Sequence, residues 1–199
     1  VAMPDAACDS SRASREARTL SCTMTLICSR LMAASRRPLA VLLVRLISSE
    51  LLDDISSAAA GFWPEAPQVL AGRDLEAGGT WFGVTRQQRF AALTNYREGG
   101  QQCADARSRG ALVADFLTGR QTPASYLGKL AAVAPEYNGF NLFIGDGERL
   151  AYCSNRGDRQ ARWLDPGIYG LSNHLLDTPW PKLAAARASF AEALTTLPK

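Results

Sequence analysis

The chain has 199 residues, of which 47% are apolar and 21% are charged, and its net charge at pH 7 is +3. This length and composition are typical of one globular domain with a hydrophobic core of its own. The positive charge is too small for a surface that binds nucleic acid, so we expect no nucleic-acid partner.

Cysteine usage and apolar runs exclude further classes of protein. The five cysteines are an odd number and no two follow the spacing Cys-x-x-Cys, which argues against a zinc site or a disulfide framework. We therefore expect no bound metal and a reducing, cytoplasmic location. The longest apolar run, residues 39–44, is far shorter than the roughly 20 residues that span a membrane, so we expect no transmembrane segment.

The first part of the chain has weak structural signals. Residues 1–38 show no sustained hydrophobic period, and we expect a disordered or spurious extension there. The domain then covers residues 39–199. Residues 39–44 predict a buried strand, and residues 45–61 predict a short amphipathic helix.

From residue 62 onward, turn signals recur at regular spacing and separate short apolar runs. The predicted strands cover residues 68–72, 80–84, 89–94, 140–144, 150–153, 162–164 and 168–171. Three hairpins are expected, one over residues 86–88, one at Asp146-Gly147, and one at residues 165–167. Asp-Gly between two apolar runs is a strong hairpin signal.

Three helices are expected among these strands. The first begins with Ser108 as its N-cap and ends at Gly119, and the second begins at Thr122-Pro123. The third runs from about Pro181 to Leu194. Because strands and helices come in separate groups, we predict an α+β fold in which helices cover antiparallel sheets.

Recognisable catalytic motifs are missing from the sequence. It contains no GxSxG, HExxH, P-loop or GxGxxG pattern. A single histidine, His174, cannot make a metal site by itself. Ser172 and Asp177 flank it, but residues so close in sequence rarely face each other as a Ser-His-Asp triad does.

Polar, glycine-containing strand ends are the remaining candidates for function. Glycine lets a ligand approach the backbone, and asparagine offers both hydrogen-bond donors and acceptors. The candidate ligand-binding residues are Arg73, Asp74, Asn95, Arg97, Asn138, Asn141, Asn173 and His174. Each could equally be a turn whose side chain caps its own backbone. Four such ends in one domain favour a shared rim that binds a small molecule.

The same stretches resemble a known family. They are residues 62–64, 69–74, 78–84, 93–97, 108–110, 137–141, 167–173 and 176–182. Over residues 62–183 this combination resembles the NRDE family, also called the transport and Golgi organization protein two family. The resemblance implies a four-layer αββα sandwich of antiparallel sheets, similar to the N-terminal-nucleophile hydrolases. It also implies that the chain stops before the last strands of the family, as a C-terminally truncated sandwich.

The resemblance further implies a role in haem trafficking, in acyl-CoA metabolism or in secretory organisation. We therefore expect a binding or trafficking protein, rather than an enzyme, for haem or an acyl-thioester-like ligand. Such a protein requires no cofactor, and haem would be its cargo.

Two alternatives stay open. An amidohydrolase of the N-terminal-nucleophile type uses the side chain of its first residue and its free α-amine. Thr25 could act in this way only if it were the mature N-terminus. The other alternative is an inactive truncated copy, because the family's Asn-Arg-Asp-Glu motif is absent where this chain reads Arg45 to Glu50.

Overall fold

A computed structural model describes residues 41–44, 56–97, 99–100 and 102–195. The expected extension at residues 1–38 and the candidate Thr25 lie outside these described residues.

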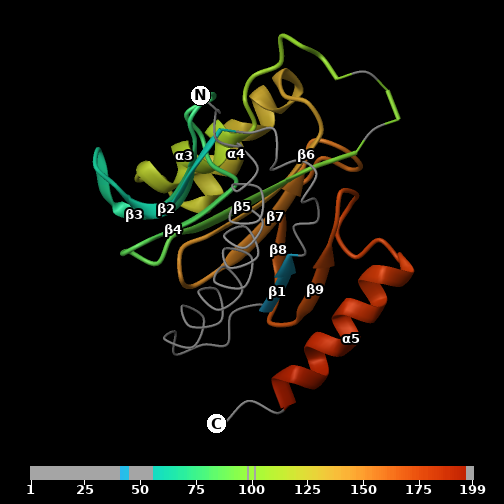
Figure 1. Cartoon of the computed structure of the whole chain (residues 1–199). Coiled ribbons are helices and arrows are strands. Elements are labelled where there is room, and N and C mark those ends of the chain that lie inside the picture. The colour runs from blue at the N-terminus through green and yellow to red at the C-terminus, as the bar shows by residue number, and fades with distance from the viewer. Residues whose placement is uncertain (1–40, 45–55, 98, 101, 196–199) are drawn as a thin grey trace, which may run out of the picture.

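The centre of the molecule is a seven-stranded antiparallel sheet with the order β2-β3-β4-β5-β6-β7-β8 (Figure 1). Its strands are β2 Ser57–Trp63, β3 Ala66–Asp74, β4 Phe82–Thr85, β5 Phe90–Asn95, β6 Phe140–Gly145, β7 Leu150–Ser154 and β8 Arg162–Leu164. Every residue of β6 and β7 is buried, because both faces of the sheet are covered at its centre. The expected hairpins at residues 86–88 and at Asp146-Gly147 are confirmed.

The helix expected over residues 45–61 is wrong where it can be tested. Residues 57–61 belong to β2, which pairs antiparallel with β3, and residues 45–55 lie outside the described part of the chain. Pairing with a nine-residue neighbouring strand overrides the local helical preference of the alanines.

A second, two-stranded sheet is formed by β1 Val41–Val44 and β9 Ile168–Leu171, which run parallel. The strand expected near residues 39–44 is therefore confirmed for its described residues. The hairpin expected over residues 165–167 is wrong, because β8 pairs with β7 whereas β9 pairs with β1. The turn is present, but it carries the chain from one sheet to the other.

The three helices are α3 Gly110–Thr118, α4 Pro123–Val133 and α5 Pro181–Thr195, and a short 3-10 turn, η1 Ala134–Glu136, follows α4. The start of α4 is as expected, since the Thr122 side chain accepts a hydrogen bond from the backbone N–H of Ser125. Ser108 is not the N-cap of α3. That position belongs to Arg109, whose side chain makes no capping bond. The loop before α3 is held by the Arg107–Tyr137 bridge, which delays the helix by one residue.

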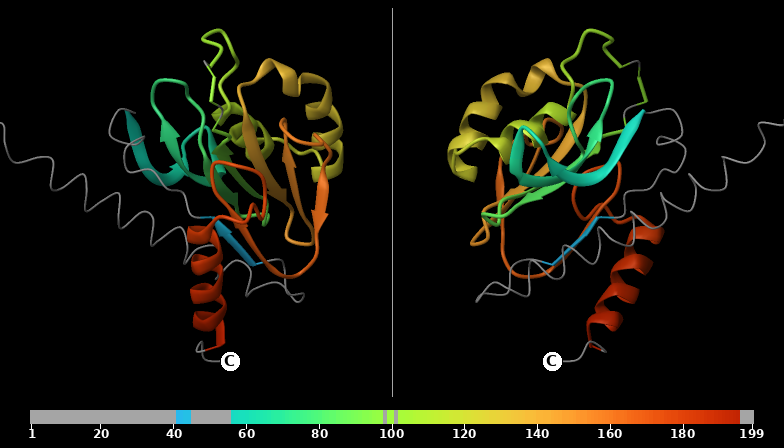
Figure 2. Two further views of the ribbon diagram at one scale, coloured as in Figure 1. Left: turned by 90° about the vertical axis from the view of Figure 1, so that its right-hand side faces the viewer. Right: turned by 60° about the vertical axis from the view of Figure 1, so that its left-hand side comes forward.

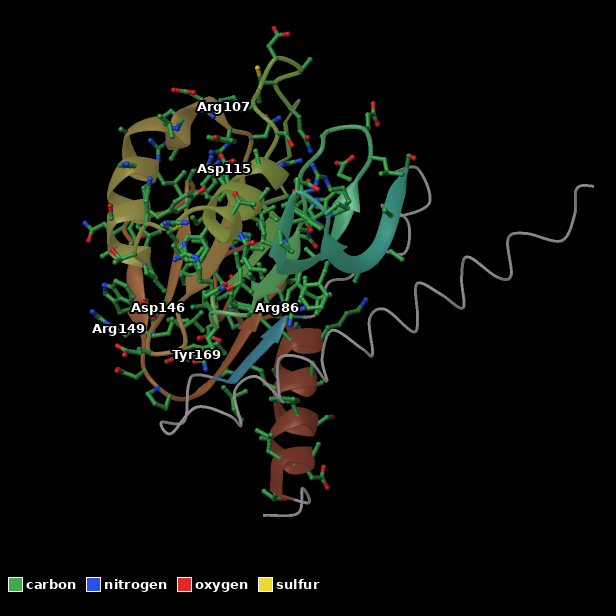
Figure 3. The ribbon with its side chains drawn as sticks, turned by 90° about the vertical axis from the view of Figure 1, so that its left-hand side faces the viewer. Arg86, Arg107, Asp115, Asp146, Arg149 and Tyr169 are labelled. Atoms are coloured by element: carbon green, nitrogen blue, oxygen red, sulfur yellow. The ribbon has the colours of Figure 1, made fainter. Side chains whose placement is uncertain are left out.

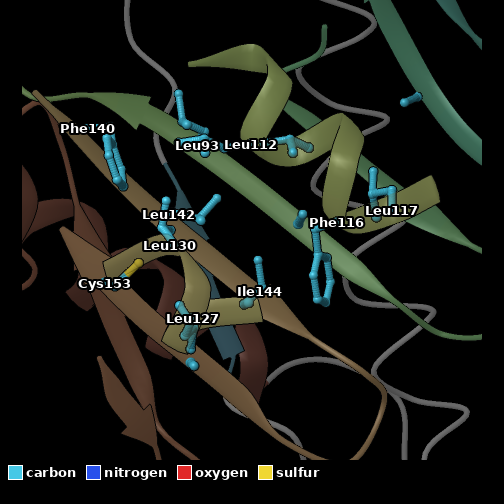
Figure 4. Packing of buried hydrophobic residues seen from close by; sticks show 14 of the residues in the cluster. Leu93, Leu112, Phe116, Leu117, Leu127, Leu130, Phe140, Leu142, Ile144 and Cys153 are labelled. Carbon is cyan, nitrogen blue, oxygen red and sulfur yellow. The ribbon is translucent and has the colours of Figure 1, made fainter. Parts of the chain in front are cut away.

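Two apolar clusters pack against opposite faces of the seven-stranded sheet. One lies under α3 and α4 and includes Leu93, Phe116 and Leu142 (Figure 4). The other includes Phe143 from the sheet and Leu171 from β9. Because side chains alternate along a strand, β5 and β6 supply residues to both clusters.

The layers therefore follow one another as helices, sheet, sheet and helix. The last layer is α5, which starts beside β9 and extends away from the sheets (Figure 2). Gly170 allows this contact, because a Cβ atom there would lie 2.7 Å from Cγ of Leu183. The described residues thus form an α+β sandwich, whose smaller sheet is parallel rather than antiparallel.

Candidate functional site

A cluster of polar side chains lies at one end of the seven-stranded sheet, where β5 ends and β6 begins. The segment that follows β9 crosses the same end and is bonded to both strands. We call this cluster the Asn/His site. Its members are Thr94, Asn95, Tyr96, Asn141, Tyr152, Ser172, Asn173, His174, Thr178 and Trp180.

Asn141 is the fully buried centre of the Asn/His site, with 0% of its surface exposed. Its amide nitrogen donates to Thr94 Oγ1 at 3.2 Å and to the carbonyl of His174 at 3.0 Å. Its amide oxygen accepts from the hydroxyl of Tyr152 at 2.7 Å. Burial raises the pKa of Tyr152 to about 12, so this hydroxyl remains a donor at neutral pH. Asn141 therefore has every polar atom of its side chain bonded.

The segment after β9 is tied to the end of β5 by three further hydrogen bonds. Asn173 Nδ2 donates to the carbonyl of Asn95 at 3.1 Å, and the backbone N–H of Arg97 donates to the carbonyl of Asn173 at 2.7 Å. The hydroxyl of Thr94 donates to the carbonyl of Ser172 at 3.3 Å. The sequence-predicted residues Asn95, Arg97, Asn141, Asn173 and His174 are thus brought together, although Arg97 takes part only through its backbone.

His174 is half-buried between two aromatic rings. Its ring centroid lies 5.0 Å from that of Tyr96 and 6.0 Å from that of Trp180, whose surface is 43% exposed. Its Nε2 atom lies 3.0 Å from the Tyr96 hydroxyl, and its Nδ1 atom lies 2.9 Å from Thr178 Oγ1. The strand-end pattern of asparagine and glycine does not single out Tyr96, Thr178 and Trp180.

Two polar atoms of the Asn/His site are buried without a hydrogen-bond partner among the described residues. They are Oδ1 of Asn95 and Oγ of Ser172. Buried polar atoms are nearly always paired, so each of these two atoms indicates a position for a bound molecule, either water or a ligand. The other two such atoms among the described residues, Trp63 Nε1 and Gln121 Oε1, lie outside the Asn/His site.

Arg73 and Asp74, which the sequence grouped with the site, serve a turn at the end of β3. Asp74 Oδ1 accepts from the backbone N–H groups of Glu76 and Ala77, at 2.9 Å each. The guanidinium of Arg73 lies over the ring of Trp63 and pairs with a carboxylate, that of Glu65.

Asn138 belongs to a neighbouring loop. Its side chain donates to the carbonyl of Cys103 and accepts from the N–H of the same residue, both at 2.9 Å. This residue lines an open pocket of about 540 Å³ together with Arg107 and Tyr137. Figure 3 shows Arg107 near Asp115 at this end of the molecule. Two of the four orphaned atoms among the described residues lie in the Asn/His site, and none belongs to a residue that lines this pocket, so we regard the Asn/His site as the better candidate.

The comparison with known proteins decides the family. The sequence profile described as Transport and Golgi organisation 2 matches residues 55–198. The chain belongs to this family. Residues 55–198 include the whole Asn/His site, so the site is part of the family's own domain.

Three curated relatives carry the same family name. The Transport and Golgi organization protein 2 homolog of Bos taurus is 46% identical over 144 residues, which is 68% of this chain and 52% of the relative. The mouse Transport and Golgi organization 2 homolog and the human Transport and Golgi organization protein 2 homolog are each 43% identical over 146 residues, or 69% of this chain and 52% of the relative. The chain therefore spans about half the length of these relatives.

This member of the Transport and Golgi organisation 2 family does not form a triad from Ser172, His174 and Asp177. Asp177 Oδ1 accepts from the backbone N–H of Gly170 at 2.8 Å and pairs with Arg187 at 3.1 Å. Both ring nitrogens of His174 are bonded elsewhere. Within the described ranges there is no group of three or more metal-binding side chains, and no helix there is long and apolar enough to cross a membrane.

Proposed function

We propose that this member of the Transport and Golgi organisation 2 family is a non-enzymatic carrier that binds a small molecule at the Asn/His site. Haem is the first candidate cargo. The proposal rests on His174, the single histidine of the chain, which is held between Tyr96 and the exposed Trp180. Imidazole is a common ligand of haem iron, and flat aromatic rings pack well against a porphyrin. The relatives are named for transport, which is the role proposed for this chain.

A haem titration tests this proposal. We expect the purified chain to shift the Soret band of ferric haem, and His174→Ala to lose that shift. Cys103→Ser is the matched control, because Cys103 is an exposed thiol that could also bind iron but lies outside the Asn/His site. A shift that survives in His174→Ala and disappears in Cys103→Ser would move the haem site away from His174. A chain that binds no haem removes haem as the cargo.

The orphaned atoms Asn95 Oδ1 and Ser172 Oγ favour an acyl-thioester-like cargo as the alternative. The pantetheine arm of such a ligand carries amide N–H donors, which are what an unpaired amide oxygen requires. Calorimetric titration with a long-chain acyl-coenzyme A should then give binding that weakens in Ser172→Ala and in Asn95→Leu. Binding that is unchanged in both variants would place the ligand elsewhere.

The order of the four layers favours one enzymatic alternative, an amidohydrolase of the N-terminal-nucleophile type. Its nucleophile would be Thr25, so mass spectrometry of the mature N-terminus tests it directly. A mature chain that retains residues ahead of Thr25 cannot use this mechanism.

We also propose a cytoplasmic location, which the cysteine pattern suggests. Cell fractionation tests it.

A further inference from the structure

We infer that the hydroxyl of Tyr96 gates the Asn/His site by occupying the one lone pair of His174 that could bind a ligand. This inference deepens the proposed function, because it rests on His174 as the residue that meets the cargo. It assigns to Tyr96 a positioning role that neither the sequence motifs nor the relatives' names indicate.

Thr178 determines which ring nitrogen of His174 carries the proton. The Thr178 hydroxyl has a single proton, and it donates this proton to the carbonyl of Leu175 at 2.7 Å. Toward His174 Nδ1, at 2.9 Å, the same oxygen can only accept. Nδ1 is therefore protonated, and Nε2 carries the lone pair of the neutral ring.

The lone pair on Nε2 is occupied by Tyr96. The phenolic hydroxyl lies 3.0 Å from Nε2 and is the donor of that bond, since Nε2 has no proton to give. Tyr96 is itself held in place on both sides. Its backbone N–H donates to the carbonyl of Gly139 at 2.9 Å, and the N–H of the next residue, Arg97, donates to the carbonyl of Asn173 at 2.7 Å.

This arrangement selects a class of ligand. A molecule that replaces Tyr96 at Nε2 must offer either a hydrogen-bond donor or an electron-accepting centre with an open position, and the iron of a ferric porphyrin is of the second kind. The Tyr96 side chain must move away before that bond forms, because its oxygen lies 3.0 Å from Nε2, and its hydroxyl then donates to water. The Thr178 bond to Nδ1 is retained, and a hydrogen bond at that nitrogen fixes the orientation of a ring that binds a metal through the other nitrogen. Binding is weakened by the lost hydrogen bond, which suits a carrier that must also release its cargo.

The first test needs no ligand, because the single histidine gives one set of ring signals. In nitrogen-15 NMR at a pH high enough for the imidazole ring to be neutral, we expect Nδ1 of His174 to be protonated and Nε2 to be unprotonated. Tyr96→Phe should keep this tautomer and shift the Nε2 resonance alone. A ring protonated at Nε2 would overturn the inference.

A second ligand-free test uses diethyl pyrocarbonate, whose carbonyl carbon is attacked by an unprotonated imidazole nitrogen with loss of the ethyl carbonate group. The ultraviolet absorbance of the modified ring then reports on His174, the only histidine. We expect Tyr96→Phe to react several times faster than the wild type. The control is Tyr169→Phe, because the Tyr169 hydroxyl bonds to the carbonyl of Asp165 and lies toward the opposite end of the sheet (Figure 3). Equal rates in the wild type and Tyr96→Phe would overturn the gate.

Ferric haem titrations then connect the gate to the proposed cargo. Removing one competing hydrogen bond should make Tyr96→Phe bind haem roughly five to ten times more tightly than the wild type. Tyr169→Phe should bind like the wild type, and the double variant Tyr96→Phe/His174→Ala should not bind. If the wild type binds haem but Tyr96→Phe binds equally or more weakly, the gate is wrong and the proposed function stands. If neither binds haem but the pyrocarbonate reaction accelerates, the gate stands and haem is not the cargo.

Discussion

Asn141 shows how one buried side chain can hold a whole segment against a sheet. It bonds Thr94 on β5, Tyr152 on β7 and the carbonyl of His174 beyond β9. Each of these partners is at least partly buried, so water could not freely take the place of the Asn141 amide if it were removed. Replacing Asn141 removes three hydrogen bonds at once, although Thr94 keeps its bond to the carbonyl of Ser172 and Tyr152 still accepts from the N–H of Leu176.

We therefore expect Asn141→Leu to lower the free energy of unfolding by about 3 kcal/mol, as measured by urea denaturation. The same variant should also weaken ligand binding at the Asn/His site, because His174 loses the bond to its carbonyl. Asn138→Leu is the matched control. The bonds of Asn138 to Cys103 are exposed, so it should cost no more than about 1 kcal/mol. A loss in Asn141→Leu no larger than in Asn138→Leu would show that the buried network adds little.

At the scale of elements, the contact between α3 and the turn after β3 depends on a glycine. A Cβ atom at Gly79 would lie 2.5 Å from the carbonyl carbon of Gly110 and 2.8 Å from its oxygen. Both are backbone atoms, and the same contact is closed by the N–H of Thr80, which donates to the Gly110 carbonyl at 3.2 Å. Neither side can move without separating α3 from the sheet.

Gly79→Ala should accordingly destabilise the fold by about 2–3 kcal/mol, which is the usual range for overpacking. Gly128→Ala makes the same chemical change but should raise the free energy of unfolding instead of lowering it. Gly128 lies inside α4 and a Cβ atom there would meet nothing within 4 Å. It should stabilise the protein by roughly 0.5–1 kcal/mol through helix propensity. Thermal denaturation of both variants measures the two changes in stability. A Gly79→Ala variant as stable as the wild type would mean that α3 is free to shift.

The elements that could be predicted from the sequence are those specified by neighbouring residues. Asp146-Gly147 defines the β6–β7 hairpin, and Thr122-Pro123 defines the start of α4, because each signal acts within a few residues. The partner of β9 could not be predicted in this way. β9 pairs with β1, and nothing in the turn at residues 165–167 distinguishes a return to β8 from a change of sheet.

The same limit applies to the Asn/His site. Asparagines at strand ends could be selected as candidates from the sequence because asparagine side chains often form hydrogen bonds at turns. That these asparagines lie close together could not be predicted, since Asn95 and Asn173 are brought into contact only by the tertiary fold. Tyr96 and Thr178 gain their roles from two bonds to the ring of His174, and those bonds leave no local pattern in the sequence.

At the scale of the whole molecule, the two apolar clusters share the same strands. β5 places Leu93 in the cluster under α3 and α4 and Ala92 in the cluster toward β9, while β6 does the same with Leu142 and Phe143. Loosening one face therefore disturbs the strands that support the other. The two faces should behave as a single cooperative unit, although the chain spans only about half the length of its curated relatives.

Cooperative unfolding is the prediction that separates a working domain from an inactive, incompletely folded copy. Phe116 and Leu171 are each fully buried, one in each cluster. We expect Phe116→Ala to cost about 3–5 kcal/mol and Leu171→Ala about 2–5 kcal/mol, because each leaves a cavity. Leu75→Ala is the control, since Leu75 is 59% exposed and its loss should change the stability by less than about 0.5 kcal/mol.

The measurement is urea denaturation followed by both far-ultraviolet circular dichroism and tryptophan fluorescence. If the two faces form one unit, both probes report one coincident transition, and each core variant moves that transition as a whole. If Leu171→Ala instead produces an early step while the main transition keeps its midpoint, then β1, β9 and α5 unfold separately from the seven-stranded sheet. The segment that carries His174 follows directly on β9, so such a result would also mean that the Asn/His site is lost before the rest of the domain unfolds.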